Sequence, residues 1–189
     1  MHLLQICVGA ALLAAAALPA QAADDILDAI DQARKAYQAN DFANAKQSLD
    51  LASQLIGQKN AEVFAELLPA ALPGWKAEKA QTTAIGSAMF GASSASRNYS
   101  NGKGDNVEVQ ITGDSAILTQ MAAFINNPQI AGAMGKIVRI GSMRAIVNND
   151  GDVHMLVANK FLVVVTGSGP ADAKLAYAQA VDVGKLSKM

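Results

Sequence analysis

The sequence predicts an α+β protein, in which an N-terminal helical hairpin precedes an antiparallel β-sheet of about six or seven strands with helices packed on it. Apolar residues recur at helical spacing through residues 24–71. From Gly74 onward the period changes to two, and short turn signals separate the alternating segments. This order is typical of the α+β class, so we expect a helical part, residues 23–71, and a sheet part, residues 72–189.

Residues 1–22 have the form of a secretory signal peptide. Leu3 to Leu18 is a run of sixteen almost wholly apolar residues, shorter than the roughly twenty that a bilayer-spanning helix needs. Pro19-Ala20-Gln21-Ala22 follows with the Ala-x-Ala pattern of a cleavage site. An uncleaved membrane anchor is the alternative, which the short run and this pattern disfavour. We therefore expect cleavage after Ala22, a periplasmic mature chain and no membrane span after cleavage.

Charge and cysteine content narrow the function classes. The 189 residues include 15 basic and 16 acidic side chains, a net charge near −1 that shows no basic cluster, so we expect no nucleic-acid partner. The single cysteine, Cys7, and one of the two histidines lie in the predicted signal peptide. We therefore expect no disulfide, no metal site and no cofactor in the mature chain.

Two apolar stripes predict the helical hairpin. The first stripe comprises Ile26, Leu27, Ile30, Ala33 and Tyr37. The second comprises Phe42, Ala45, Leu49, Ala52 and Ile56. Between them, Asn40 is expected to end one helix in the left-handed conformation and Asp41 to cap the next. Gly57 is expected to end the second helix, and Asn60 to cap a third that stops at Pro69.

Alternating segments predict the strands of the sheet. The strand candidates are residues 75–79, 95–100, 107–112, 136–140, 144–148, 152–158 and 161–167. Residues 86–94 are interpreted as a loop or a poorly packed strand. Helices are expected at 114–125 and from Pro170 to Val181, with at most a short extra turn of helix at 130–134. Trp75 is expected to fill the core where the helices meet the sheet.

Part of the helical region resembles a known repeat. The segment 26–56 is similar to a single tetratricopeptide-type helical hairpin, with matches at Ala33, Tyr37, Asn40-Asp41-Phe42, Ala45 and 49–56. Arrays of this type need at least three stacked units, and no second copy follows. The resemblance implies either a hairpin packed on its own domain, which we favour, or a peptide-binding arm.

Two further resemblances concern the sheet and the whole chain. Residues 72–183 resemble PsbP/Mog1-like α/β/α sandwiches in element order and in Leu72-Pro73-Gly74-Trp75. The chain also resembles an uncharacterised family of small exported bacterial α+β proteins in Ala88-Met89-Phe90-Gly91 and Ser94-Ala95-Ser96-Arg97. These resemblances imply a fold and export, but they supply neither site residues nor an activity.

Two segments invite a chemical interpretation. Residues 148–152, Asn-Asn-Asp-Gly-Asp, place acidic side chains as a calcium loop does, but the glycine stands fourth instead of sixth and no Glu follows. Asp-Gly between two alternating runs favours a hairpin turn. His154 is the one histidine outside the signal, and we interpret it as a structural strand residue rather than a metal ligand or general base.

No catalytic motif is recognisable, so we expect a binding protein rather than an enzyme. The candidate binding residues are polar side chains within strands: Arg97, Glu108, Arg139, Arg144 and His154. The first hypothesis is an exported accessory protein that binds an unknown envelope protein or component through the helical hairpin or a sheet edge. A second is a carrier of a small apolar ligand, in a helix-sheet cavity lined by residues 85–92 and 117–125. A third is a carboxylate-based hydrolase using acids among Glu108, Asp114, Asp150 and Asp152.

Overall fold

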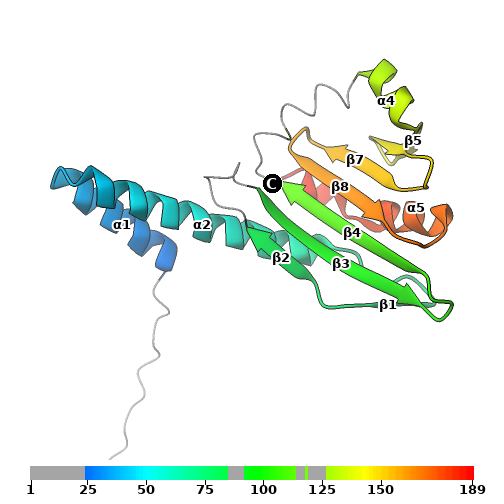
Figure 1. The fold of residues 1–189 in the computed structure, drawn as a ribbon, viewed down its shortest axis with the longest axis horizontal. Helices are drawn as coiled ribbons and strands as arrows, with labels where there is room; N and C mark the ends of the chain where they lie inside the picture. The colour runs from blue at the N-terminus through cyan, green and yellow to red at the C-terminus, as the bar shows by residue number, and fades with distance from the viewer. Residues whose placement is uncertain (1–23, 85–91, 114–117, 119–126) are drawn as a thin grey trace, which may run out of the picture.

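The computed structural model describes residues 24–84, 92–113, 118 and 127–189 and confirms the α+β class (Figure 1). An N-terminal helical pair is followed by an eight-stranded antiparallel sheet with helices packed on it. The helical pair extends from the sheet as an arm, and only the C-terminal part of its second helix runs along the sheet (Figure 1). In these residues, no helix has both the length and the apolar character needed to cross a bilayer.

The helical hairpin forms where its caps predict it. Helix α1 spans Asp25–Gln38 and α2 spans Phe42–Leu67. Asn40 adopts the left-handed conformation, with φ of 59°, and Asp41 caps α2 by accepting a 3.2 Å hydrogen bond from the Asn44 amide. At the start of α1, the Asp24 carboxylate accepts from the amides of Ile26 and Leu27. These bonds satisfy amides that have no partner inside a helix.

The predicted end of the second helix at Gly57 is wrong. Helix α2 continues through Gly57 and Asn60 to Leu67, so the predicted third helix is its last part. Gly57 lies where α2 crosses the sheet: a Cβ added to it would lie 3.4 Å from Ser93 Oγ and 3.5 Å from Ala84 Cβ. Both distances are ordinary van der Waals contacts, so the helix packs against the sheet at this point. Because this packing holds the helix, one glycine does not end it.

The strands pair in the order β1-β3-β4-β8-β7-β6-β5, and β2 pairs with β3 beside β1. Their bounds are β1 Trp75–Ala77, β2 Gln81–Ala84, β3 Ser93–Asn101, β4 Asn106–Gly113, β5 Lys136–Ile140, β6 Met143–Val147, β7 Val153–Val157 and β8 Phe161–Thr166. Strand β2 had no counterpart among the predicted strands. It continues the β1 edge after one extra residue, since Ala77 pairs with Tyr99 whereas Gln81 pairs with Ser96.

The sheet has an inner face, which is buried, and an outer face. The inner face carries a row of fully buried valines and other apolar residues, and α2, α5 (Ala171–Ala180) and α6 (Val183–Leu186) contribute to this core. The row across the central strands comprises Val109, Val165 and Val153, each with no exposed surface. Alternation places the neighbouring residues, such as Gln110, Val164 and His154, on the outer face.

After β4 the sequence predicts a helix at 114–125 and a short extra turn at 130–134. Helix α4, Pro128–Met134, contacts β5 and β6, and is longer than the extra turn predicted there. Of the predicted helix 114–125 the structure describes Leu118, which is helical and buried. The remaining residues of that helix, and residues 85–91, lie outside the described part of the chain.

An aromatic cluster joins the end of α2 to the sheet. The Tyr99 hydroxyl donates a 2.6 Å hydrogen bond to the Pro69 carbonyl, and the Tyr177 hydroxyl accepts a 3.2 Å bond from the Leu72 amide. The rings of Tyr99 and Tyr177 lie 4.2 Å apart, and Trp75 packs edge-on against Tyr177 at 5.6 Å. Trp75 therefore packs at the junction of helices and sheet, as predicted.

Candidate functional site

Strand pairing separates the five predicted polar residues onto two faces. Glu108, His154, Arg144 and Arg139 belong to the outer face, because they alternate with buried residues or pair with residues that do. Arg97 pairs with the fully buried Val109 and belongs to the inner face. Alternation within one strand cannot reveal this difference, because the register between strands decides which residues share a face.

Arg97 ties the sheet to the segment after α2. Its Nη1 donates a 3.2 Å hydrogen bond to the Pro69 carbonyl, the same oxygen that accepts from Tyr99. Burial foremost raises the pKa of Tyr99 to about 12, so its hydroxyl keeps the proton that this bond requires. Arg97 therefore acts as a structural tether at this junction, away from the outer face.

Glu108 and His154 lie on the outer face but belong to different rows. Glu108 pairs with Asn98 on one side and Thr166 on the other. His154 pairs with Ile146 and Val164, both apolar. Strand β8 lies between the strands of Glu108 and His154, so the two side chains form no cross-strand pair.

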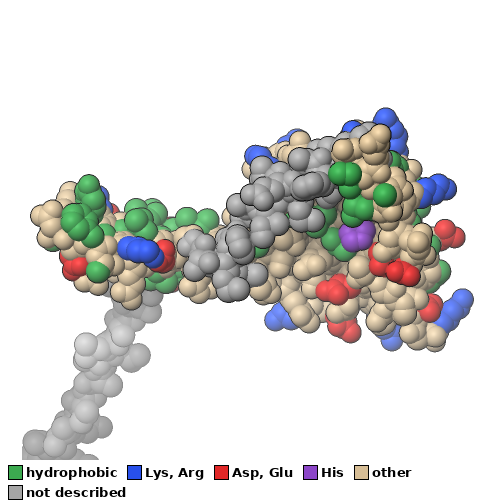
Figure 2. Space-filling model, turned by 45° about the horizontal axis from the view of Figure 1, so that its top comes forward, with side chains coloured by type: hydrophobic (Ala, Val, Ile, Leu, Met, Phe, Trp, Pro, Cys, Tyr) green, Lys and Arg blue, Asp and Glu red, His purple; other side chains and the backbone are tan. Residues whose placement is uncertain are grey.

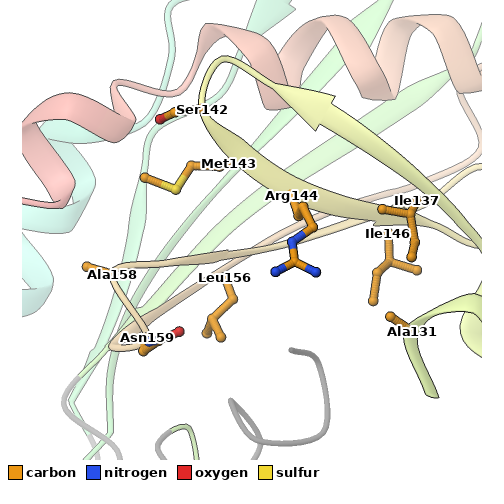
Figure 3. A pocket seen from close by; sticks show the side chains of 9 residues that line it. All are labelled: Ala131, Ile137, Ser142, Met143, Arg144, Ile146, Leu156, Ala158 and Asn159. Carbon is orange, nitrogen blue, oxygen red and sulfur yellow. The ribbon is translucent and has the colours of Figure 1, made fainter. Parts of the chain in front are cut away.

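Arg144 lies in a hollow of about 260 Å³ at the β5–β7 end of the outer face (Figure 3). Most of the described lining is apolar, and its described residues are Ala131, Ile137, Ser142, Met143, Arg144, Ile146, Leu156, Ala158 and Asn159. In Figure 3 the Arg144 guanidinium reaches into the space between Leu156 and Ile146. The sequence interpretation found the arginine but not its apolar neighbours, since α4 and the β7–β8 turn approach it only in the folded chain.

Arg139 and Arg144 form a directly opposed pair on neighbouring strands. Like charges in this position repel each other and destabilise the strand pair. Within the described residues, neither guanidinium has a hydrogen bond or an ion pair to relieve that repulsion. The hollow therefore combines an apolar floor with uncompensated positive charge.

A second charged cluster, which the sequence interpretation missed, surrounds the buried Lys174. Its side chain is 2% exposed, and its ammonium contacts Asp152 Oδ1 at 2.8 Å, the Asp150 carbonyl at 2.6 Å and the Gly167 carbonyl at 3.1 Å. The turn at 148–152, whose sequence resembles a calcium loop, therefore binds the ammonium group of Lys174. The sequence does indicate that Lys174 is buried, because it lies on the same helical stripe as Tyr177, Ala178 and Val181.

The carboxylate of Asp152 is held by two donors. Besides Lys174, Asn148 Nδ2 donates to Asp152 Oδ2 at 3.2 Å, while Asn148 Oδ1 accepts from the amides of Asp150 and Asp152. Burial alone would raise the pKa of Asp152, but the bonds from Lys174 and Asn148 outweigh it and lower that pKa. This confirms the hairpin turn and makes Asp152 a structural ion-pair partner.

The carboxylates of the hydrolase hypothesis do not converge in the described part of the chain. Asp152 is paired with Lys174, Asp150 lies exposed in the turn, and Glu108 lies across β8 from them. Asp114 lies outside the described residues. In the same described part, no three His, Cys, Asp or Glu side chains are grouped as metal ligands would be.

The helical hairpin presents two different flanks to solvent. On one, Asp25, Asp28 and Gln32 of α1 border a groove floored by Leu51 and Leu55 of α2. The other, which we call the apolar flank, comprises Ile30, Tyr37, Phe42, Leu49 and Ile56. At 100° per residue, these residues lie on the side of each helix opposite to the residues of the first flank. The Tyr37 and Phe42 rings meet at the hairpin tip, 5.8 Å apart. Figure 2 shows apolar side chains gathered on this arm.

The interface between α1 and α2 is built from small residues. Its buried members are Ala29 and Ala33 of α1 and Ala45 and Ala52 of α2. Both predicted stripes are present, but only their alanines, together with Ala29, are buried in this interface, whereas Tyr37, Phe42 and Leu49 are 66%, 60% and 56% exposed. The large apolar residues of the two stripes therefore belong neither to the buried hairpin interface nor to the core of the sheet.

Comparisons with protein-family models, curated proteins and solved structures found no match to this chain. The resemblances to the tetratricopeptide hairpin, to PsbP/Mog1-like folds and to small exported bacterial proteins therefore stay predictions.

Proposed function

We propose that this chain is an exported, non-enzymatic binding protein that holds a protein of the cell envelope with the apolar flank of its hairpin. The export part of the proposal rests on the signal-like residues 1–22. The binding part rests on one observation: the hairpin buries alanines between its two helices and leaves the five large side chains of the apolar flank exposed.

That arrangement is unfavourable for an arm without a partner. Covering apolar surface stabilises by about 25 cal/mol per Å², and the apolar flank leaves five large side chains outside any core. Contiguous apolar surface of this kind is typical of interaction sites. Tyr37 and Phe42 at the tip are also the residue types that contribute most energy at protein interfaces.

The spacing of the flank favours a helical partner. Phe42, Leu49, Ile56 and Val63 recur every seven residues along α2, and all are exposed. A seven-residue apolar repeat is the pattern that packs against another helix. A separate protein fits better than a second copy, because residues 24–67 contain eight acidic and only four basic side chains. Two such hairpins repel each other.

Site-specific photo-crosslinking in the cells that make the protein tests this proposal. A photoreactive amino acid is placed at Leu49 or Ile56 on the apolar flank, or at Gln32 or Gln58 on the other flank as matched controls. We expect one defined adduct from positions 49 and 56 only. Adding Phe42→Gln should abolish the adduct, because it removes the aromatic anchor at the tip.

Three outcomes would contradict the proposal. Equal adducts from all four positions would indicate non-specific contact. An adduct with the mass of two copies of this chain would make the flank a self-association surface. No adduct at any position would leave the flank without a partner. Deleting the hairpin is a poorer test, because α2 also supplies Phe64 to the core of the sheet.

The second hypothesis, a carrier of a small apolar ligand, keeps one observation in its favour. The hollow at Arg144 is bordered by α4 and by strands, as a helix-sheet cavity would be. The residues named for that cavity, 85–92 and 117–125, lie almost entirely outside the described part of the chain. The hollow supports ligand binding as an activity additional to that of the hairpin.

A further inference from the structure

We infer that the hollow at Arg144 binds a short amphipathic anion, a carboxylate carried on an apolar chain. Its centre on the outer face is the Arg144 side chain, with Ile137, Ile146, Leu156 and Met143 around it. This inference does not rest on the hairpin's role, since the hollow lies on the sheet, remote from the arm. It supplies a ligand class for the carrier hypothesis.

The positive charge of the site favours a ligand with an anionic head group. None of the nine lining residues is acidic, and the opposed Arg139 adds a second positive charge next to the hollow. An anion between the two guanidinium groups would relieve their repulsion. The planar guanidinium donates two parallel hydrogen bonds to a carboxylate, which a single ammonium cannot do.

The apolar part of the lining determines which ligand tail fits the hollow. Ile146 and Leu156 form a buried floor, and Ile137 and Met143 stand at the sides. The volume of about 260 Å³ falls just below the range of about 300–1,000 Å³ that holds drug-sized ligands. A medium-length alkyl chain therefore fits better than a large ring system. Arg144 is the one charged side chain among the described lining residues, and six of the other eight are apolar, so a ligand with one charged end and an apolar tail suits this lining.

Titration of the purified full-length chain with sodium octanoate tests the inference. We expect saturable binding with a dissociation constant on the order of 1 mM, as suits a ligand of about ten non-hydrogen atoms. Backbone amide NMR shifts should concentrate at residues 137, 144–146 and 156. Octan-1-ol should bind about tenfold more weakly, and octylammonium should not bind.

Variants separate the head group from the tail. Arg144→Gln should weaken octanoate binding about tenfold while leaving octanol binding unchanged, and Arg144→Lys should restore part of the affinity. Ile137→Gln should weaken both ligands, and its half-exposed position leaves the fold intact. Lys103→Gln, in the distant β3–β4 turn, is the matched loss of one positive charge and should change neither.

Several results would overturn the inference. Octanoate that fails to saturate, or that shifts amides elsewhere, would show that the hollow is not its site. Equal affinity for octanoate and octanol, or an unchanged affinity in Arg144→Gln, would show that the arginine does not select the head group. A crosslinking partner on the hairpin would not alter these outcomes, so the two proposals fail independently.

Discussion

The hairpin and the sheet use opposite classes of side chain in their interiors. Between α1 and α2 the buried residues are alanines, whereas the sheet buries Phe64, Tyr99, Tyr177 and rows of valine. Helix α2 belongs to both regions, with Phe42 60% exposed at one end and Phe64 fully buried at the other. The sheet and the helices packed on it therefore share a core of large apolar side chains, whereas the interface between α1 and α2 is built from small ones and leaves large apolar side chains exposed.

The two phenylalanines of α2 offer the largest contrast. Phe64→Ala removes a ring packed edge-on against Phe161 at 5.7 Å and should destabilise the protein by about 3–5 kcal/mol. Phe42→Ala, at the tip, should cost less than about 1 kcal/mol. Urea unfolding followed by the fluorescence of Trp75, the single tryptophan, measures both. Similar losses at the two positions would contradict the division into a packed sheet and an open arm.

Lys174 is a buried charged residue of the sheet region, and its replacement measures the energetic importance of that charge. Lys174→Met keeps the chain length but removes the ammonium, leaving Asp152 and the carbonyls of Asp150 and Gly167 without their donor. We expect a loss of about 3 kcal/mol, the lower end for breaking a buried pair, because Asp152 retains some contact with water. Lys160→Met, exposed in the β7–β8 turn, is the control and should change the unfolding free energy by less than about 0.5 kcal/mol.

Enlarging the alanine interface should disturb only the arm. Ala33→Leu places extra methyl groups between α1 and α2 and should cost about 1–3 kcal/mol by overpacking. Because α1 packs on α2 in the part of the arm that extends from the sheet (Figure 1), hydrogen exchange should show lost amide protection in α1 while the strands keep theirs. Ala43→Leu, on an exposed side of α2, is the matched control. Loss of strand protection in Ala33→Leu would show that arm and sheet unfold together.

The smallest expected effect is a change in acid sensitivity at the Lys174 cluster. The folded pKa of Asp152 is lowered, so its contribution to stability is present above its unfolded pKa and is lost as pH falls through the folded pKa. Asp152→Asn should therefore be less stable than the parent near neutral pH and approach it as the pH falls through the lowered folded pKa of Asp152. Urea midpoints across this range measure the effect. A constant gap between parent and variant at all pH values would contradict the ion pair.

The sequence by itself determined most of the described elements, with strand β2 and the single long helix α2 as the exceptions. Asn40 and Asp41 end and begin helices through local backbone preferences, and the alternation of residues 107–112 locates β4, because each depends on residues close in the chain. The α+β class follows from the same local patterns. The interpretation of residues 148–152 as a turn was also correct, since its hydrogen bonds run within five residues.

Only the tertiary structure decided which residues share a surface. Periodicity identifies a stripe on a helix but not which of its members the neighbouring helix covers, so the burial of alanines and the exposure of Phe42 and Leu49 were not predictable. The continuation of α2 through Gly57 depends on strands more than twenty residues away. The separation of Arg97 from Arg144 depends on register, and the pairing of Lys174 with Asp152 depends on contact between a helix and a distant turn. Local sequence patterns determine local conformation, whereas contacts between residues far apart in the chain determine which side chains are buried and which are exposed.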